Sequence, residues 1–162
     1  MHEIRCSDAA LAAACVVQRV ARGGPGGQHA NKTASGVRLV HRRSGLVVEA
    51  TGSRDGGANR TAALRRLRLA LACACRGGAD PGWLRPHVRG GRLHCGPEAP
   101  SWPAVAAVLL DVLELHQGAL TEAAAAAGLS TTQLAKALVA DQQVRRVAEA
   151  IRSAAGLGAL HA

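Results

Sequence analysis

The chain has 162 residues, 48% of them hydrophobic, and carries a formal net charge of +9 from 20 basic and 11 acidic side chains. Its length suits one compact domain, or a domain of ordinary size with a small appendage, and its charge favours a polyanionic partner, most simply a nucleic acid. Phe and Tyr are absent and Trp occurs twice, so RNA recognition by stacking bases on aromatic rings is nearly excluded, and Arg and Lys must supply the contacts.

The first half of the chain predicts a small sheet followed by a helix. Ser7 or Asp8 can cap a short helix over 9–14, and the β-branched residues of 15–21 predict a strand. Residues 36–42 alternate apolar and basic side chains, and a turn at 43–45 leads to a return strand over 46–50. From Asn59 the apolar spacing changes to three and four residues, which predicts a basic amphipathic helix packed on the sheet. The glycine-rich run 77–82 ends this helix.

The second half predicts helices only. We interpret residues 77–102 as a connector, after which a helix begins at Pro103, a residue suited to a first helical turn. Further helices are expected over 120–127, 131–139 and 141–154. The predicted fold class is therefore α+β: a small mixed or antiparallel sheet with a packed basic helix over 1–76, the connector, and an all-helical extension over 103–162.

A glycine-dense loop lies between the first two strands, with the sequence Gly23-Gly24-Pro25-Gly26-Gly27-Gln28-His29-Ala30-Asn31-Lys32-Thr33. Glycine loses more backbone freedom on ordering than any other residue, so this density indicates a backbone shape that side chains would forbid. A phosphate-binding loop needs glycine directly before its lysine, where this chain has Asn31. A dinucleotide-binding loop needs a last glycine where this chain has His29. Both nucleotide-binding interpretations fail, and what remains is a loop that presents a glutamine amide.

Several motifs occur in a fixed order: Gly24-Pro25-Gly26-Gly27-Gln28-His29, Asn31-Lys32, Val37-Arg38-Leu39, His41, Gly45-Leu46-Val47-Val48, Arg54 and Asn59-Arg60. Together they resemble the catalytic domain of bacterial-type peptide chain release factors, over roughly residues 15–75. The resemblance implies that Gly26, Gly27 and Gln28 enter the peptidyl transferase centre of the ribosome and promote hydrolysis of the peptidyl-tRNA ester. The Gln28 backbone N–H would then stabilise the developing oxyanion by roughly 3 kcal/mol. No general base is evident, so ribosomal RNA and substrate would complete the site.

The same resemblance implies ribosomal RNA contacts by Arg22, His29, Asn31, Lys32, Arg38, Arg42, Arg43, Arg54, Arg60 and Arg65. For each arginine by itself, a solvated surface charge is the alternative. The chain departs from the family pattern at Ala21, where an arginine is usual, and at Gly56, where a glutamine is often found. The partners implied are the ribosome and peptidyl-tRNA, and we expect a monomer that does not bind membranes.

Three alternatives stay open at this point. A ribosome- or RNA-binding module could keep the loop without hydrolytic activity. We also expect neither a codon-reading domain nor a Lys/Arg-rich tail, which leaves open whether terminating or stalled ribosomes are the substrate. Finally, residues 120–134 have the helix, glycine turn and capped second helix of a helix-turn-helix, which would either bind a nucleic acid such as DNA or belong to a helical packing or partner-docking bundle.

The five cysteines, Cys6, Cys15, Cys73, Cys75 and Cys95, are odd in number and contain no Cys-x-x-Cys pair. This argues against a disulfide framework and against a zinc ribbon. A group formed by Cys73, Cys75, His87, His94 and Cys95 matches no common ligand spacing, so we predict no metal ion and no other cofactor. No signal peptide or transmembrane run is evident, and we expect a cytoplasmic location.

Overall fold

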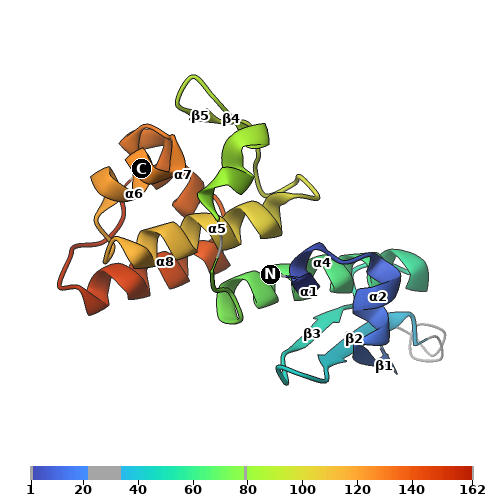
Figure 1. The fold of residues 1–162 in the computed structure, drawn as a ribbon. Helices are drawn as coiled ribbons and strands as arrows, with labels where there is room; N and C mark the ends of the chain where they lie inside the picture. The colour runs from blue at the N-terminus through green and yellow to red at the C-terminus, as the bar shows by residue number, and fades with distance from the viewer. Residues whose placement is uncertain (1, 22–33, 79, 162) are drawn as a thin grey trace. The chain divides into compact units, whose positions relative to one another are not determined.

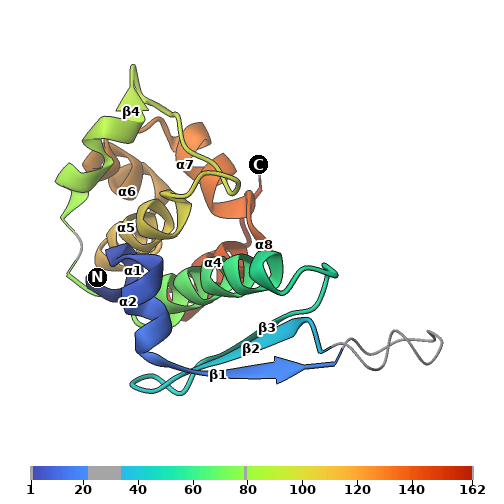
Figure 2. The same ribbon diagram turned by 90° about the vertical axis from the view of Figure 1, so that its right-hand side faces the viewer.

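The computed structural model describes residues 2–21, 34–78 and 80–161. These residues divide into two units, His2–Leu71 and Ala72–Ala162. Figures 1 and 2 show the elements of both units. The domain bounds expected from the sequence, 1–76, 77–102 and 103–162, stay predictions.

The first unit contains a three-stranded antiparallel sheet and three helices. The strands β1 (Cys15–Val20), β2 (Gly36–His41) and β3 (Val47–Ala50) pair in the order β1-β2-β3. The helices are α1 (His2–Arg5), α2 (Asp8–Ala13) and α4 (Gly56–Ala74), whose last turn already belongs to the second unit. In Figure 2, α4 lies over one face of the sheet. The predicted α+β class and antiparallel pairing are thus confirmed.

The alternation in β2 explains which face of the sheet is buried. Val37, Leu39 and His41 are buried, whereas Arg38 and Val40 between them are partly exposed. Helix α4 contributes a buried stripe of small and branched residues at helical spacing, which are Ala63, Leu64, Leu67, Ala70 and Leu71. The core is therefore aliphatic, as the composition requires.

Helix α4 begins three residues earlier than the apolar spacing predicts. Its first turn contains Gly56 and Gly57, so the expectation that it starts at Asn59 is wrong. Glycine has low helix propensity, which is why the sequence did not predict a helix there. The Asp55 carboxylate accepts hydrogen bonds from the backbone N–H groups of Gly57, at 2.9 Å, and Ala58, at 3.2 Å. These bonds satisfy helix donors that would otherwise lack partners. The cap therefore starts the helix where the side-chain pattern does not.

The second unit is a helical bundle with a short hairpin. It contains a 3₁₀ helix η1 (Pro81–His87), the strands β4 (Val88–Arg89) and β5 (Arg92–Leu93), and the helices α5 (Trp102–Leu115), α6 (Leu120–Ala127), α7 (Thr131–Val139) and α8 (Gln142–Ala154). Helix α5 is almost wholly buried and packs against η1, α6, α7 and α8. The predicted bounds of α6 and α7 are confirmed, whereas η1 and the β4–β5 hairpin were not predicted.

The helix ends of this unit follow local capping rules. Gly128 ends α6 in the left-handed region at φ 69°, and the Ser130 hydroxyl caps α7 by accepting from the Gln133 N–H at 3.3 Å. Asp141 caps α8 in the same way, with its carboxylate 2.8 Å from the Gln143 nitrogen. Among the described helices, none is both long and apolar enough to cross a lipid bilayer.

Candidate functional site

The predicted catalytic residues Gly26, Gly27 and Gln28 lie outside the described residues. The same holds for four of the predicted RNA contacts, Arg22, His29, Asn31 and Lys32. The structure does describe the two points at which the glycine-dense loop joins the fold. Val20, the last residue of β1, is the register partner of Gly36, the first residue of β2. The loop is therefore the connection of two adjacent antiparallel strands.

Gly36 makes a close approach of these two strands possible. A Cβ added at Gly36 would lie 2.7 Å from the carbonyl oxygen of Val20 and 2.8 Å from side-chain atoms of Val20 and Thr51. Because one of these atoms belongs to the backbone, a larger residue cannot be accommodated by a rotamer change alone. The end of β1 is thus pressed against the start of β2 in a way that requires glycine.

Asn59 fixes the chain directly before β2. Its side chain is buried and donates to the carbonyl oxygens of Ser35 and Ser53, at 2.8 Å each, while its carbonyl oxygen accepts from the Ser53 N–H at 2.9 Å. The Ser35 hydroxyl adds a bond to the Ser53 carbonyl at 3.2 Å. One amide in the first turns of α4 therefore holds the segment entering β2 and the segment leaving β3. Sequence reasoning placed Asn59 in a motif but did not identify this role.

Six of the predicted RNA contacts are arginines in the described part of the chain, and they are spread over β2, the turn after it, and α4 with the segment before it. On the sheet, Arg38 forms an ion pair with Glu49 at 3.2 Å, with both side chains about half exposed. At the turn after β2, the Arg42 guanidinium donates to the Ala13 carbonyl at 3.1 Å, and Arg43 is largely exposed. The remaining three arginines are exposed. Arg54 precedes α4, and Arg60 and Arg65 lie on it. The first unit thus presents several separate positive groups, and their contacts with RNA stay predictions.

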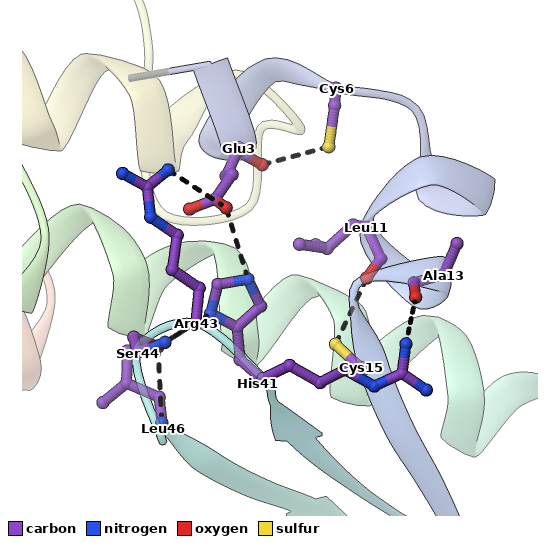
Figure 3. A network of polar contacts seen from close by, with 10 residues as sticks. Glu3, Cys6, Leu11, Ala13, Cys15, His41, Arg43, Ser44 and Leu46 are labelled. Carbon is purple, nitrogen blue, oxygen red and sulfur yellow. Dashed lines mark hydrogen bonds and ion pairs between the residues drawn. The ribbon is translucent and has the colours of Figure 1, made fainter.

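A polar network ties the turn after β2 to the N-terminal helices (Figure 3). The His41 ring is fully buried, with Nδ1 2.7 Å from the Ser44 hydroxyl and Nε2 3.6 Å from a carboxylate oxygen of Glu3. Arg43 approaches the same oxygen at 3.8 Å. Nearby, burial raises the pKa of the Cys15 thiol, which donates to the Leu11 carbonyl. Since no substrate can reach a fully buried imidazole, we assign this network to packing.

Arg68 joins α4 to the same N-terminal segment. Its guanidinium lies 2.7 Å from an Asp8 carboxylate oxygen and donates to the Ile4 carbonyl at 2.9 Å. The side chain is only 13% exposed, which distinguishes it from the exposed arginines of α4. In the described part of the chain, no group of three or more His, Cys, Asp or Glu side chains is arranged to hold a metal ion.

Comparison with known proteins gives a match to the first half of the chain. Residues 13–76 match the family model of the RF-1 domain. The peptide chain release factor 1 of Caldicellulosiruptor bescii is 51% identical over 49 residues, which are 30% of this chain and 14% of the relative. That of Dictyoglomus thermophilum is also 51% identical over 49 residues, again 30% of this chain and 13% of the relative. The chain thus spans only a small part of these relatives, and no solved structure matches it.

Proposed function

We propose that this protein hydrolyses the ester bond of peptidyl-tRNA on the ribosome, because residues 13–76 match the RF-1 domain and the similar proteins are peptide chain release factors. The matched segment contains the Gly26-Gly27-Gln28 sequence, and this is the observation that carries the proposal. In the proposed complex the loop enters the peptidyl transferase centre, where RNA and substrate provide most of the active site.

The proposed chemistry needs little from the protein beyond one aimed donor. Attack of water on the ester places negative charge on the carbonyl oxygen, and the Gln28 N–H is the group we assign to that oxygen. A single donor of this kind stabilises the transition state by about 3 kcal/mol. The Gln28 side chain shapes the pocket so that water is admitted and larger nucleophiles are not.

The described residues support this proposal through the way the loop is attached. A donor contributes to catalysis only if it is held in place before the reaction, since reorienting it during the reaction would cost free energy. The close packing at Gly36 and the three hydrogen bonds of Asn59 fix the backbone on the β2 side of the loop. The described residues directly before β2 are therefore held in a defined position.

The charge of the first unit supports RNA as its surroundings. Residues 2–71 contain most of the arginines of the chain against only four acids, Glu3, Asp8, Glu49 and Asp55. Arg38 and Arg68 are engaged with Glu49 and Asp8. Arg42 and Arg43 contact Ala13 and Glu3 from an exposed turn, and Arg54 and Arg60 are exposed. Such groups meet phosphates and set the position of a domain on RNA.

The test is a peptide-release assay on ribosomes that carry labelled peptidyl-tRNA, with and without a stop codon in the vacant site. The variant is Gly27→Ala, because alanine resists backbone angles that glycine adopts freely. Gly52→Ala is the matched control, since a Cβ at Gly52 meets no atom within 4 Å. Ribosome binding is measured in parallel by co-sedimentation.

We expect release by the wild-type protein and the control, and a loss of about a hundredfold for Gly27→Ala with ribosome binding retained. Equal release by Gly27→Ala and wild type would reject the catalytic assignment. Binding without release by the wild-type protein on both kinds of ribosome would instead favour a non-catalytic ribosome-binding module.

A further inference from the structure

The hairpin of the second unit places two arginines opposite each other. Strands β4 and β5 are joined by Gly90 and Gly91, whose φ angles are +55° and +72°. A two-residue turn with both φ angles positive matches the twist of a hairpin and needs residues such as glycine. Arg89 and Arg92 flank the turn as register partners, and both are exposed.

The pairing of Arg89 with Arg92 destabilises the isolated hairpin. Like charges directly opposite each other on antiparallel strands repel, and a hairpin of two residues per strand has little pairing to offset the repulsion. The described ion pairs of this unit form at Arg76 and Arg145, and none includes Arg89 or Arg92. The two guanidinium groups are therefore a concentrated positive charge without an acidic partner in the described chain.

The acids of this unit are mostly engaged elsewhere. Asp111 and Glu114 contact Arg76, at 3.3 Å and 2.9 Å, and Glu149 contacts Arg145 at 2.8 Å. Two further acids cap helices through backbone N–H groups, Asp80 at η1 and Asp141 at α8. The charge at the hairpin turn is thus left for an external anion.

The hairpin is also held in a fixed position. The Gly91 carbonyl accepts from the Ser130 N–H at 2.9 Å, which joins the turn to the residue that caps α7. The other end is closed by a bond from the His94 N–H to the His87 carbonyl at 2.8 Å. Strand β5 packs against α7. Figure 1 shows the hairpin at the top of the second unit.

The start of α7, which contacts the hairpin through Ser130 and Gly91, carries further anion-binding groups. Thr131, Thr132 and Lys136 are exposed on the helix, and the N-terminus of a helix carries a partial positive charge. Hydroxyl groups, an ammonium group and paired guanidinium groups are the donors that proteins use for nucleic-acid phosphates. Guanidinium groups in particular bind phosphate oxygens bidentately.

We propose that the hairpin 88–93 and the first turns of α7 form a second RNA-binding surface, which contacts the phosphate backbone of RNA. We call it the Arg89–Arg92 surface. The choice of RNA over DNA rests on the proposed ribosomal function, whereas the assignment of a phosphate backbone rests on the charges and donors described above. The surface gives the second unit an RNA contact of its own, in addition to those expected of the first unit.

The test measures binding of the full chain to a fluorescein-labelled RNA stem-loop and to duplex DNA of the same stem sequence, over a range of salt concentrations. The variant R89Q/R92Q removes both hairpin charges. The matched control R145Q/R146Q removes two charges from exposed arginines of α8. Because the first unit is expected to bind RNA as well, the informative quantity is the difference between these two equally charged variants.

We expect R89Q/R92Q to bind the stem-loop about tenfold more weakly than wild type, with the slope of log affinity against log salt reduced by about two. The control should weaken binding much less. Both variants should remain folded in thermal unfolding. R89K/R92K should recover the salt dependence, which follows the charge, but only part of the affinity, because an ammonium group does not bind bidentately.

Equal weakening by the two double variants would overturn the proposal. Tighter binding of duplex DNA than of RNA by the wild-type protein, lost in R89Q/R92Q, would overturn the choice of RNA. Peptide release is measured on the same preparations. A wild-type protein that releases no peptide would contradict the proposed function, while the difference in RNA binding between the variants would still decide the present inference.

Discussion

Replacing Asn59 by alanine tests whether this one amide fixes the base of the loop. The substitution removes the hydrogen bonds at 2.8 Å, 2.8 Å and 2.9 Å to Ser35 and Ser53. The Ser53 carbonyl keeps the Ser35 hydroxyl as a donor, but the Ser35 carbonyl and the Ser53 N–H each lose the bond to the Asn59 side chain. A buried group left without a partner costs about 1–3 kcal/mol.

Both serines are partly exposed, so water recovers some of this cost, and alanine regains about 0.5 kcal/mol of helix propensity. We therefore expect a net loss of about 2 kcal/mol in the free energy of unfolding of the first unit. That loss corresponds to an increase of about thirtyfold in the exchange rate of amides that open by unfolding of the sheet.

Amide hydrogen exchange of β2 is the suitable assay. Both tryptophans, Trp83 and Trp102, lie in the second unit, so tryptophan fluorescence would not report on the sheet. Thr61→Ala is the control, because the Thr61 hydroxyl makes only an exposed bond to the Gly57 carbonyl at 3.2 Å. An increase below about threefold for Asn59→Ala, or an equal effect of Thr61→Ala, would refute the reasoning.

Two further predictions concern close packing and a buried thiol. Gly36→Ala should destabilise the first unit by about 2 kcal/mol in the same exchange assay, because its Cβ meets the Val20 carbonyl at 2.7 Å, whereas Gly52→Ala should not. In the second unit, burial raises the pKa of the Cys73 thiol to about 11 from its ordinary 9.0, with Asp141 adding to the rise and Arg76 opposing it. The folded state keeps this proton while the unfolded state releases it, so the stability contribution is present below pH 9 and falls as pH rises to about 11. Thermal unfolding followed by tryptophan fluorescence should show that Cys73→Ala removes this part of the pH dependence and that Cys75→Ala, at an exposed position, does not.

Much of the fold was predictable because it is encoded locally. The alternation of Val37, Arg38 and Leu39 is the periodicity of a half-buried strand, and it gave β2 almost to the residue. Helices α6 and α7 were predicted with their observed bounds because Gly128 and Ser130 mark the turn between them by their own backbone and side-chain chemistry.

The start of α4 and the β4–β5 hairpin were not predicted, and the causes are again local. Gly56 and Gly57 argue against a helix, yet the Asp55 carboxylate starts α4 there. The β4–β5 hairpin has two residues in each strand, which is too short for an alternation to be read. Its Arg89-Gly90-Gly91-Arg92 sequence is a turn signal, and the pairing of the arginines became evident only with the register.

The sequence by itself determined the glycine-dense loop, the failure of the nucleotide-binding interpretations, the uneven charge and the resemblance to release factors. These features depend on the identity and order of neighbouring residues. The tertiary structure decided that Asn59 reaches Ser35, 24 positions away, and that Gly36 lies against Val20. It also decided that His41 is buried beside Glu3 and that Gly91 bonds to Ser130. Such contacts join segments far apart in the chain, and a pattern of neighbouring residues does not specify which distant backbone group a side chain will meet.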